Sequence, residues 1–433
     1  MVRSVRVVAC LAFGISTQVF AAGFQLQEQN VTNLGTAYSG TAALAQDASM
    51  AFFNAAGLSH IDESQVVLSG VLIQGHFHFL ASRSNVSLLP NTIVAGDRDD
   101  DPARAVVAPA FYIAKRLDEH WVLGLSVNSP FGLLTDYNPM GIARYIGTYS
   151  SIMTVNISPS LSYEVLPCLS LGFGVDAEYG KASYEANVGF GIAALDGFQK
   201  NMGTGWGYGW HAGILWEPFE PDTTRIGLHY RSHVMMEFEG VAGVLVAGTV
   251  PGPYLMQRVH TAIVLPGSAT FSFYRELVPC LAMTGDIAWT NWHRFDALTF
   301  SYNPGISPGI DTDIVADWKD SWRYALGLIY TLNENWLFRI GGAFDQSPTN
   351  DAHRTIQIPD SDRYWAAIGG AYTFNEDFRI DFGYARIFFE DTAVNQIAPY
   401  RTNTTTPASY AAIVGGFKNF ANIVGIQIRY DFV

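Results

Sequence analysis

The residue types that most often carry chemistry are few in this chain, and they are scattered. Residues 305–309 read Gly-Ile-Ser-Pro-Gly and match the Gly-x-Ser-x-Gly pattern around a nucleophilic serine. That pattern presents its serine on a sharp turn between a strand and a helix. Here it stands in a loop rich in proline and glycine, so we interpret the match as chance. We expect that the protein is not an enzyme, and a hydrolase is kept as a remote alternative.

Residues that would bind a metal ion or a cofactor form no recognisable motif. The acidic run at residues 96–102, GDRDDDP, offers the carboxylates that a divalent cation prefers, but such runs in loops are usually only solvated. No cluster of His, Cys, Asp and Glu has metal-ligand spacing, and no phosphate-binding loop occurs. We therefore expect no metal and no cofactor. The net charge of −14 argues against a nucleic-acid partner, which requires a basic surface.

The first residues of the chain predict export. Arg3 and Arg6 precede an apolar core at residues 7–15, and a small-x-small cleavage site ends at Ala21. We expect residues 1–21 to be a signal peptide, which would leave a mature chain beginning AGFQLQEQNV. No later run of 18 or more apolar residues occurs, so we expect no transmembrane helix.

Large and small side chains alternate along much of the mature chain. Residues 322–344, WRYALGLIYTLNENWLFRIGGAF, place a large apolar side chain at nearly every second position on both sides of a turn at residues 333–335. The residues between them are mostly small or polar. Such a period of two predicts strands with two different faces. We call the face with the large apolar side chains the heavy face and the other the light face. If the turn pairs Leu332 with Trp336, Arg323 lies opposite Asp345, and we expect these two side chains to form an ion pair.

The same alternation predicts fourteen strands, which begin near residues 65, 106, 120, 152, 169, 206, 223, 258, 280, 321, 336, 361, 377 and 410. Their connections alternate between short turns and long loops. An even number of strands of about 10–12 residues with alternating connections is typical of an outer-membrane barrel. We therefore predict an all-β fold, a 14-stranded antiparallel transmembrane β-barrel over residues 63–433, in the outer membrane of a bacterium.

A secreted β-sandwich is the alternative, since its strands also alternate. Aromatic residues, however, cluster at the strand ends, where a membrane barrel carries its interfacial girdles. The members of this cluster are Trp322, Tyr324, Trp336, Phe344, Tyr430 and Phe432. A sandwich buries its heavy face and has no reason for such rings. The heavy face is therefore expected to meet lipid.

Residues 22–62, which precede the first strand, do not alternate. Small residues dominate this segment and charges are few. A binding tail in the periplasm would be more polar. Small residues that pack tightly suit a plug, or hatch, folded inside the barrel.

Several segments resemble the outer-membrane long-chain fatty acid transporter family. In residues 22–62 the resemblance lies in Leu34-Gly35, Ala37-Tyr38-Ser39-Gly40, Asp47-Ala48 and Asn54-Ala55-Ala56-Gly57-Leu58. Further segments follow in the order of that family: NSPFGLLTDY, GWGYGWHAGILWEP, TRIGLHYRS, WRYALGLIY, GGAFDQSP and IPDSDRYWAAIGGAYTF. The resemblance implies a monomeric 14-stranded barrel in lipid, plugged by an N-terminal hatch, that takes up long-chain fatty acids or similar hydrophobic molecules passively.

The resemblance also implies a route. Substrate would enter a groove between outer loops, move to a pocket beside the mature N-terminus, and leave through a lateral opening at a kink in the third strand. Apolar residues of two loops and of the N-terminus are the expected substrate-binding residues: Phe24, Leu26, Phe190, Ile192, Leu195, Phe198, Val244, Leu245, Val246 and Leu255. Contiguous apolar residues in surface loops suggest such a patch, although they would also serve to pack the two loops together.

The expected opening and hatch contact are formed by Asn54, Ala55, Ala56, Asn128, Ser129, Pro130, Phe131 and Gly132. Alternation fails at residues 128–132, and proline lacks the N–H that a central strand needs. Ordinary strand termination at the outer rim is the other interpretation. The hatch motif of the family has proline where this chain has Ala55, so we expect a looser contact between the hatch and the kinked strand.

A second departure concerns the substrate. The basic residues that the family uses for a fatty-acid carboxylate have no counterpart here, where Ala186 and Ile314 stand. Lys181, Arg225 and Arg339 are candidates to substitute for them. A buried carboxylate without such a partner would be costly, which weakens the prediction of a fatty acid. Uptake of neutral aromatic or alkane hydrocarbons by the same route is therefore the alternative. A general porin would instead need an open, highly charged lumen and no hatch.

Overall fold

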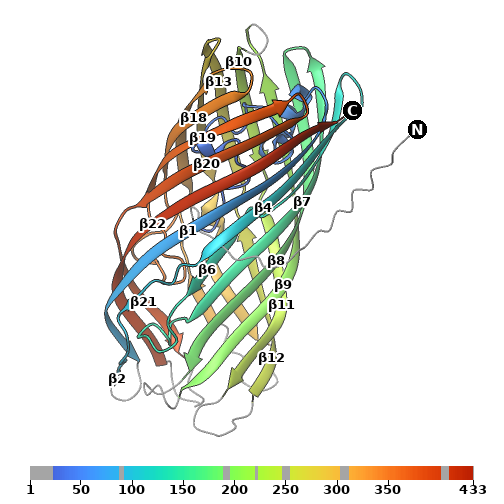
Figure 1. The fold of residues 1–433 in the computed structure, drawn as a ribbon. Coiled ribbons are helices and arrows are strands. Elements are labelled where there is room, and N and C mark those ends of the chain that lie inside the picture. Colours follow the sequence, from blue (N-terminus) through green and yellow to red (C-terminus); the bar gives the residue numbers. More distant parts are fainter. Residues whose placement is uncertain are drawn as a thin grey trace, which may run out of the picture.

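The computed structural model describes residues 23–86, 92–188, 196–219, 223–245, 254–302, 312–400 and 409–432. In this part of the chain the strands form one closed antiparallel barrel of 14 strands, as predicted (Figure 1). The expected signal peptide and the Gly-x-Ser-x-Gly match at residues 305–309 lie outside the described residues. None of the described helices is long and apolar enough to cross a membrane.

The secondary-structure elements follow the barrel wall in chain order. The strands are β1 (Ser64–Val86), β2 (Thr92–Ile93), β3 (Asp99–Asp100), β4 (Ala105–Arg116), β5 (Trp121–Asn128), β6 (Gly132–Asp136), β7 (Tyr149–Leu166), β8 (Leu169–Val188), β9 (Gly197–Trp216), β10 (Thr224–Arg231), β11 (Val234–Leu245), β12 (Tyr254–Leu265), β13 (Ser268–Val278), β14 (Leu281–Thr290), β15 (Ala297–Tyr302), β16 (Thr312–Val315), β17 (Ser321–Thr331), β18 (Trp336–Asp345), β19 (Arg363–Asn375), β20 (Phe378–Phe389), β21 (Thr392–Tyr400) and β22 (Ser409–Phe432). The short helices are η1 (Leu34–Thr36), α1 (Met50–Phe53), η2 (Ala55–His60) and η4 (Trp292–Arg294).

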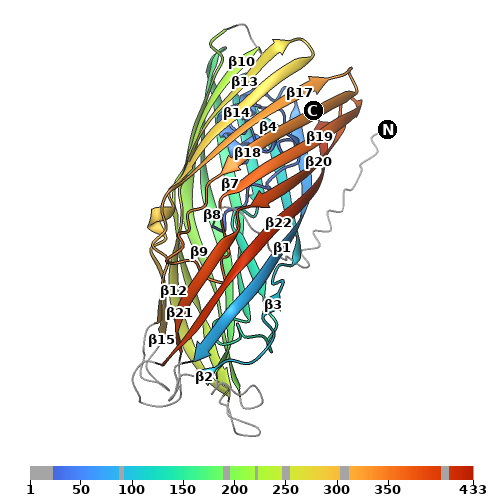
Figure 2. The same cartoon turned by 90° about the vertical axis from the view of Figure 1, so that its left-hand side faces the viewer.

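The barrel closes between its first and last strands. β1 pairs with β22 from Ser64↔Phe432 to Val86↔Ala411. The expected strand length of about 10–12 residues is wrong for these two strands, since β1 has 23 residues and β22 has 24. A tilted strand of about 10 residues crosses the apolar layer, so the rest of each strand continues past the membrane into the end that carries the long loops (Figure 2).

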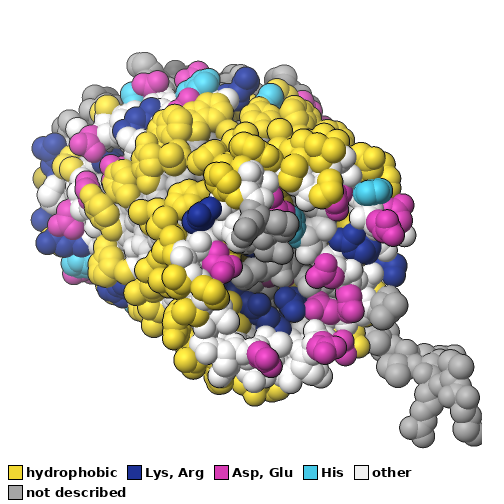
Figure 3. Space-filling view, turned by 90° about the horizontal axis from the view of Figure 1, so that it is seen from above, with side chains coloured by type: hydrophobic (Ala, Val, Ile, Leu, Met, Phe, Trp, Pro, Cys, Tyr) yellow, Lys and Arg dark blue, Asp and Glu magenta, His cyan; other side chains and the backbone are white. Residues whose placement is uncertain are grey.

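The heavy face of the alternating strands points outward. Leu326 in β17 is 61% exposed, whereas Ala325 and Ile329 are buried. Figure 3, the view from the end with the short turns, shows hydrophobic side chains over much of the outer wall and charged side chains at the mouth of the barrel. Both observations fit a barrel whose outer wall meets lipid.

Arg323 lies opposite Asp345 in the β17–β18 ladder, as the turn predicted. The expected ion pair between them is wrong. The Arg323 guanidinium donates instead to the carbonyl oxygens of Ala37 and Tyr38 in the segment inside the barrel. Asp345 pairs with Arg363, whose Nη2 lies 3.1 Å from Asp345 Oδ2. Arg323 therefore bonds to the segment inside the barrel, while Asp345 bonds to the residue opposite it on the next strand, β19.

The segment from Gly23 to Ile61 fills the barrel near its short-turn end (Figure 1). Glycines on the light face make room for it. A Cβ on Gly369 would lie 2.8 Å from the Gly35 Cα, and one on Gly213 would collide with Asn54 Oδ1. The Asp286 carboxylate accepts the N–H groups of Gly40, at 2.6 Å, and of Thr41. We call this segment the hatch.

Candidate functional site

The third strand of the barrel wall, formed by β5 and β6 together, is interrupted at residues 129–131. β5 ends at Asn128, β6 begins at Gly132, and both pair with β7. On the other side, pairing between β4 and β5 ends at Phe111↔Val127. Proline at position 130 has no N–H to donate to a ladder, so the sequence indicated the interruption correctly. We call residues 128–132 the break.

The first residues of the hatch bond to the break. Leu26 N–H donates to the Pro130 carbonyl at 2.8 Å, and Gly132 N–H donates to the Phe24 carbonyl at 2.9 Å. Gln25 and Phe131 form an isolated antiparallel bridge between them. The N-terminal segment therefore takes the place of a neighbouring strand at the break.

The Phe24 side chain lies in an aromatic cluster and is 2% exposed. Its ring centroid is 4.8 Å from that of Trp292, 5.3 Å from that of Phe295 and 5.8 Å from that of Trp318. Edge-to-face and tilted ring pairs at these distances are favourable beyond the apolar area that they bury. Phe24 is thus held by packing from the opposite wall as well as by its backbone.

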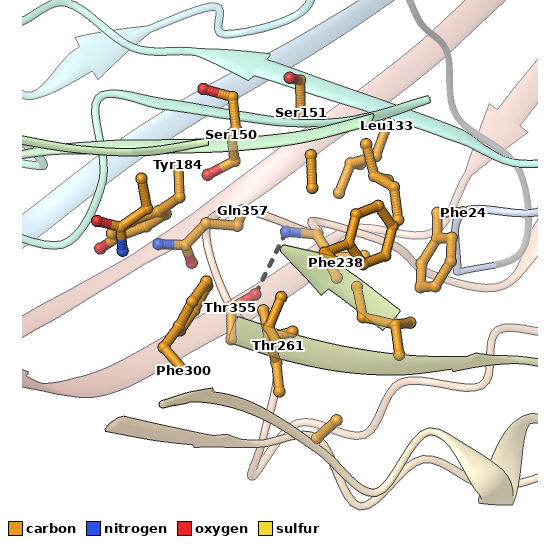
Figure 4. Close-up of a pocket in the computed structure, with 18 of the residues that line it drawn as sticks. Phe24, Leu133, Ser150, Ser151, Tyr184, Phe238, Thr261, Phe300, Thr355 and Gln357 are labelled. Carbon is orange, nitrogen blue, oxygen red and sulfur yellow. Dashed lines mark hydrogen bonds between the residues drawn. The ribbon is translucent and has the colours of Figure 1, made fainter. Parts of the chain in front are cut away.

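A mainly apolar cavity of about 120 Å³ lies beside Phe24 (Figure 4). Its wall comes from the inward faces of β6 to β9, β11 and β12, and from residues near η4. The segment between β18 and β19 also enters the lumen and contributes Thr349, His353, Thr355, Gln357 and Ile358. The sequence contains no signal for this segment, because the segment has no strand alternation and only its flanks contain landmarks of the family.

The cavity contains several polar side chains, and most of them are already hydrogen-bonded. Tyr184 OH donates to the Ile146 carbonyl at 2.6 Å. Gln357 Nε2 donates to the same carbonyl at 2.9 Å, and its Oε1 accepts from Gln396 at 3.0 Å. Thr261 Oγ1 is buried and has no hydrogen-bond partner among the described atoms.

Two buried carboxyls, those of Asp360 and Glu28, lie at the N-terminal part of the hatch, and Asp360 bonds to it. Asp360 Oδ2 accepts Gly23 N–H at 2.9 Å and Ser347 Oγ–H at 2.6 Å, and burial raises the pKa of this carboxyl. Burial also raises the pKa of the Glu28 carboxyl to about 7, while the nearby Arg363 guanidinium opposes this rise. Desolvation favours the neutral form of each acid.

The residues expected to form an outer-loop groove are only partly described. Phe190, Ile192, Leu195 and Val246 lie outside the described residues. Phe198, half-buried, pairs with Leu245, and Leu255 pairs with Val244. These residues therefore lie side by side in one sheet, where β11 pairs with both β9 and β12. Their role in binding stays a prediction.

The hydrogen bonds of Asn54 and Ala56 lead to other parts of the barrel than the break, while η2 packs against β5, the strand that ends there. The Asn54 amide donates to the Ala42 carbonyl at 2.7 Å and to the Ile214 carbonyl of β9 at 3.1 Å. Ser162 Oγ of β7 donates to the Ala56 carbonyl at 3.1 Å. These residues therefore fix the hatch to β7, β8 and β9. The hydrogen bonds to the break come instead from the backbone of Phe24 and Leu26.

The basic residues proposed as carboxylate partners also lie elsewhere. Lys181 is exposed on the outer side of β8, since Ala182 and Tyr184 take the inward positions. Arg339 Nη1 lies 2.8 Å from Asp381 Oδ1. The Arg225 guanidinium stacks on the Tyr274 ring at 4.3 Å. None of the three is among the described residues that line the cavity, so this expectation is wrong.

Ser158, Asp176 and His211 come together inside the barrel. Ser158 Oγ lies 3.5 Å and Asp176 Oδ2 lies 3.2 Å from the same imidazole nitrogen, His211 Nδ1. A catalytic triad places its serine and its carboxylate on opposite nitrogens. The arrangement is therefore not that of a serine hydrolase. Within the described ranges no group of three or more His, Cys, Asp and Glu could hold a metal ion.

The chain matches, over residues 12–432, the model of a family described as "Outer membrane protein transport protein (OMPP1/FadL/TodX)". It belongs to this family. A long-chain fatty acid transport protein of Salmonella typhi is 30% identical over 415 residues, which cover 89% of this chain and 92% of the relative. The protein is thus an outer-membrane β-barrel, and the members of its family are transport proteins.

Two solved structures share the fold of this family member. A FadL homologue of Pseudomonas aeruginosa superposes with a TM-score of 0.84 at 20% identity, over 95% of this chain and all of its own (100%). The toluene transporter TodX of P. putida superposes with a TM-score of 0.69 at 15% identity, over 93% of this chain and 98% of its own. At these identities the likeness concerns the barrel and its hatch alone.

Proposed function

We propose that this protein is a passive channel through which hydrophobic molecules enter across the outer membrane. The position of Phe24 carries this proposal. Its side chain lines the apolar cavity, and its backbone carbonyl bonds to Gly132 at the break in the wall. One residue therefore separates a molecule in the cavity from the place where the wall is interrupted.

The proposed exit is sideways through the break rather than down the barrel axis. Axial passage would require the hatch to leave its glycine-lined seat and its bonds to Arg323 and Asp286. A shift of residues 23–26 breaks far fewer contacts, among them the two backbone bonds of Phe24 and Leu26. Each such bond contributes only about 0.5–1.5 kcal/mol net. The Phe24 ring must also leave its packing against Trp292 and Phe295, and the binding of the ligand would offset this loss.

The outer loops are proposed to collect the substrate. Phe198, Val244, Leu245 and Leu255, with the residues of the same loops outside the described ranges, keep the role expected from their sequence. The proposed substrates are long-chain fatty acids, as the name of the Salmonella relative states for that protein, or neutral aromatic and alkane hydrocarbons of similar apolarity.

The remaining features complete the proposal. Residues 1–21 would be removed as a signal peptide, residues 22–62 would form the hatch, and residues 63–433 would form the barrel. The protein would act as a monomer in lipid, without catalysing a reaction. Its apolar wall and its enclosed hatch need no second subunit to complete the cavity.

A titration of the detergent-purified protein tests the function. The rings of Trp292 and Trp318 pack on Phe24, so intrinsic fluorescence should report the entry of oleate or of a neutral hydrocarbon. Phe24→Ala should weaken binding and release the probe faster from loaded liposomes. Phe338→Ala removes an aromatic ring from the outer wall and should change neither. Equal behaviour of the two variants would contradict the proposal.

A further inference from the structure

We infer that the cavity beside Phe24 prefers uncharged molecules that carry one hydrogen-bonding group, such as alcohols or esters, over carboxylates. The inference rests on the proposed function, because it names the chemical class that the same cavity would take. It depends on two observations: the charge of the wall, and one buried hydroxyl group without a partner.

The part of the wall that the structure describes offers no cation of fixed charge. Among the described residues that line the cavity there is no lysine and no arginine. A carboxylate that enters an apolar site without a counter-charge loses its hydration and gains nothing equivalent.

The imidazole of His353 is the one side chain of the described wall that could become positive. Its Nδ1 lies 3.2 Å from Asn350 Oδ1 and 3.7 Å from Asp317 Oδ2. A carboxylate of the protein thus already faces this ring. A second carboxylate, brought by the ligand, would be repelled by Asp317 as well as attracted by a protonated ring.

Thr261 contributes a buried hydroxyl group to the wall, in addition to the hydroxyl groups of the serines that line it. The amides and the phenol of Gln357 and Tyr184 are bonded within the protein, and Asn201 Nδ2 donates to Tyr302 OH at 3.0 Å. Thr261 is 7% exposed, and its Oγ1 has no partner among the described atoms. Most buried hydroxyl groups have a partner. Of the buried hydroxyl groups without one among the described residues, that of Thr261 is the one whose residue lines the cavity, so it is suited to a group that arrives with the ligand.

The geometry supports recognition of one end of a ligand. Thr261 follows Val259 and precedes Ile263 on the inward face of β12, and all three line the cavity. Figure 4 shows Thr261 across the cavity from Ser150 and Ser151, with Phe24 and Phe238 along the remaining wall. A hydroxyl group both donates and accepts, so it fits an alcohol or a carbonyl oxygen. The apolar remainder would extend toward Phe24.

The test compares three ligands with the same chain length: 1-decanol, decane and decanoate at pH 8. Each is titrated into the full-length mature protein in detergent, with tryptophan fluorescence as the readout. We expect 1-decanol to bind at least tenfold more tightly than decanoate. Thr261→Val removes the hydroxyl group at constant shape and should weaken 1-decanol binding about 3- to 10-fold, with decane unchanged. Thr331→Val, at an exposed position of β17, should change nothing.

The outcomes separate the inference from the function. Decanoate that binds as tightly as 1-decanol, or a Thr261→Val variant with unchanged affinity for 1-decanol, would overturn the inference and leave the channel function standing, since ligand still binds. If folded protein bound none of the three, the proposed function would fall and the inference with it. A preference for decane over 1-decanol would also overturn the inference and favour a hydrocarbon channel.

Discussion

Gly132 N–H donates to the carbonyl oxygen of Phe24 at 2.9 Å. This hydrogen bond connects the first described residues of the hatch to the break in the third strand of the barrel. The two residues are far apart in sequence and belong to different parts of the fold. Because the same Phe24 lines the cavity with its ring, a movement of Phe24 changes both the cavity and this bond.

Weakening this connection should open the channel. Leu26→Pro removes the N–H that bonds to the Pro130 carbonyl at 2.8 Å. We expect a several-fold faster leak of a hydrophobic dye from liposomes that contain the variant. Leu26→Ala keeps the N–H and should leak much less. If both variants leaked equally, the Leu26 side chain rather than its backbone hydrogen bond would keep the break closed.

The seat of the hatch should be intolerant of added volume. Gly213→Ala would drive a Cβ into Asn54 Oδ1, and such overpacking costs about 1–3 kcal/mol. A lower midpoint in heat-induced unfolding of the barrel would show it. Gly70→Ala is the matched control, since a Cβ there meets no atom within 4 Å. Adding Asn54→Ala to Gly213→Ala should recover part of the loss.

The buried pair of Arg339 and Asp381 should be strongly coupled. Its atoms are 2.8 Å apart, and both side chains are almost fully buried. Asp381→Leu leaves the buried Arg339 guanidinium without its carboxylate, a loss that costs about 3–5 kcal/mol. Arg339→Met should cost less, because Asp381 keeps Arg379 at 2.8 Å as a second partner. Arg339→Met and Asp381→Leu together should therefore cost less than the sum of the two single changes. The exposed pair of Lys418 and Asp391, at 3.6 Å, should show a coupling of less than about 1 kcal/mol.

Glu28 should make the protein less stable as the pH rises. Its pKa is raised from 4.5 to about 7 by burial, so the folded protein keeps a proton that the unfolded chain loses in this window. Stability should fall between about pH 4.5 and pH 7 and then level off. Glu28→Gln should remove this component and be the more stable protein at pH 8. Unfolding midpoints measured from pH 4 to pH 8 would show it, and parallel curves for both proteins would contradict it.

Much of the barrel was predictable from local patterns. Strand parity has a period of two residues, so the sequence alone indicates which side chains of β17 face outward and which face the lumen. The short turn at residues 333–335 sets the register, which is why the opposition of Arg323 and Asp345 was predicted correctly. Pro130 marked the interruption for an equally local reason, its missing N–H.

The partners inside the lumen were decided by the tertiary structure alone. Arg323 donates to Ala37 and Tyr38 rather than to Asp345 across its own hairpin, and Lys181 points away from the cavity that its neighbour Ala182 lines. The cavity itself needs Trp318 and the segment from Thr349 to Ile358, which follow no periodic pattern. Alternation determines on which side of a strand a residue lies. Only the closure of the barrel around the hatch determines what it meets there, because that depends on contacts between segments hundreds of residues apart.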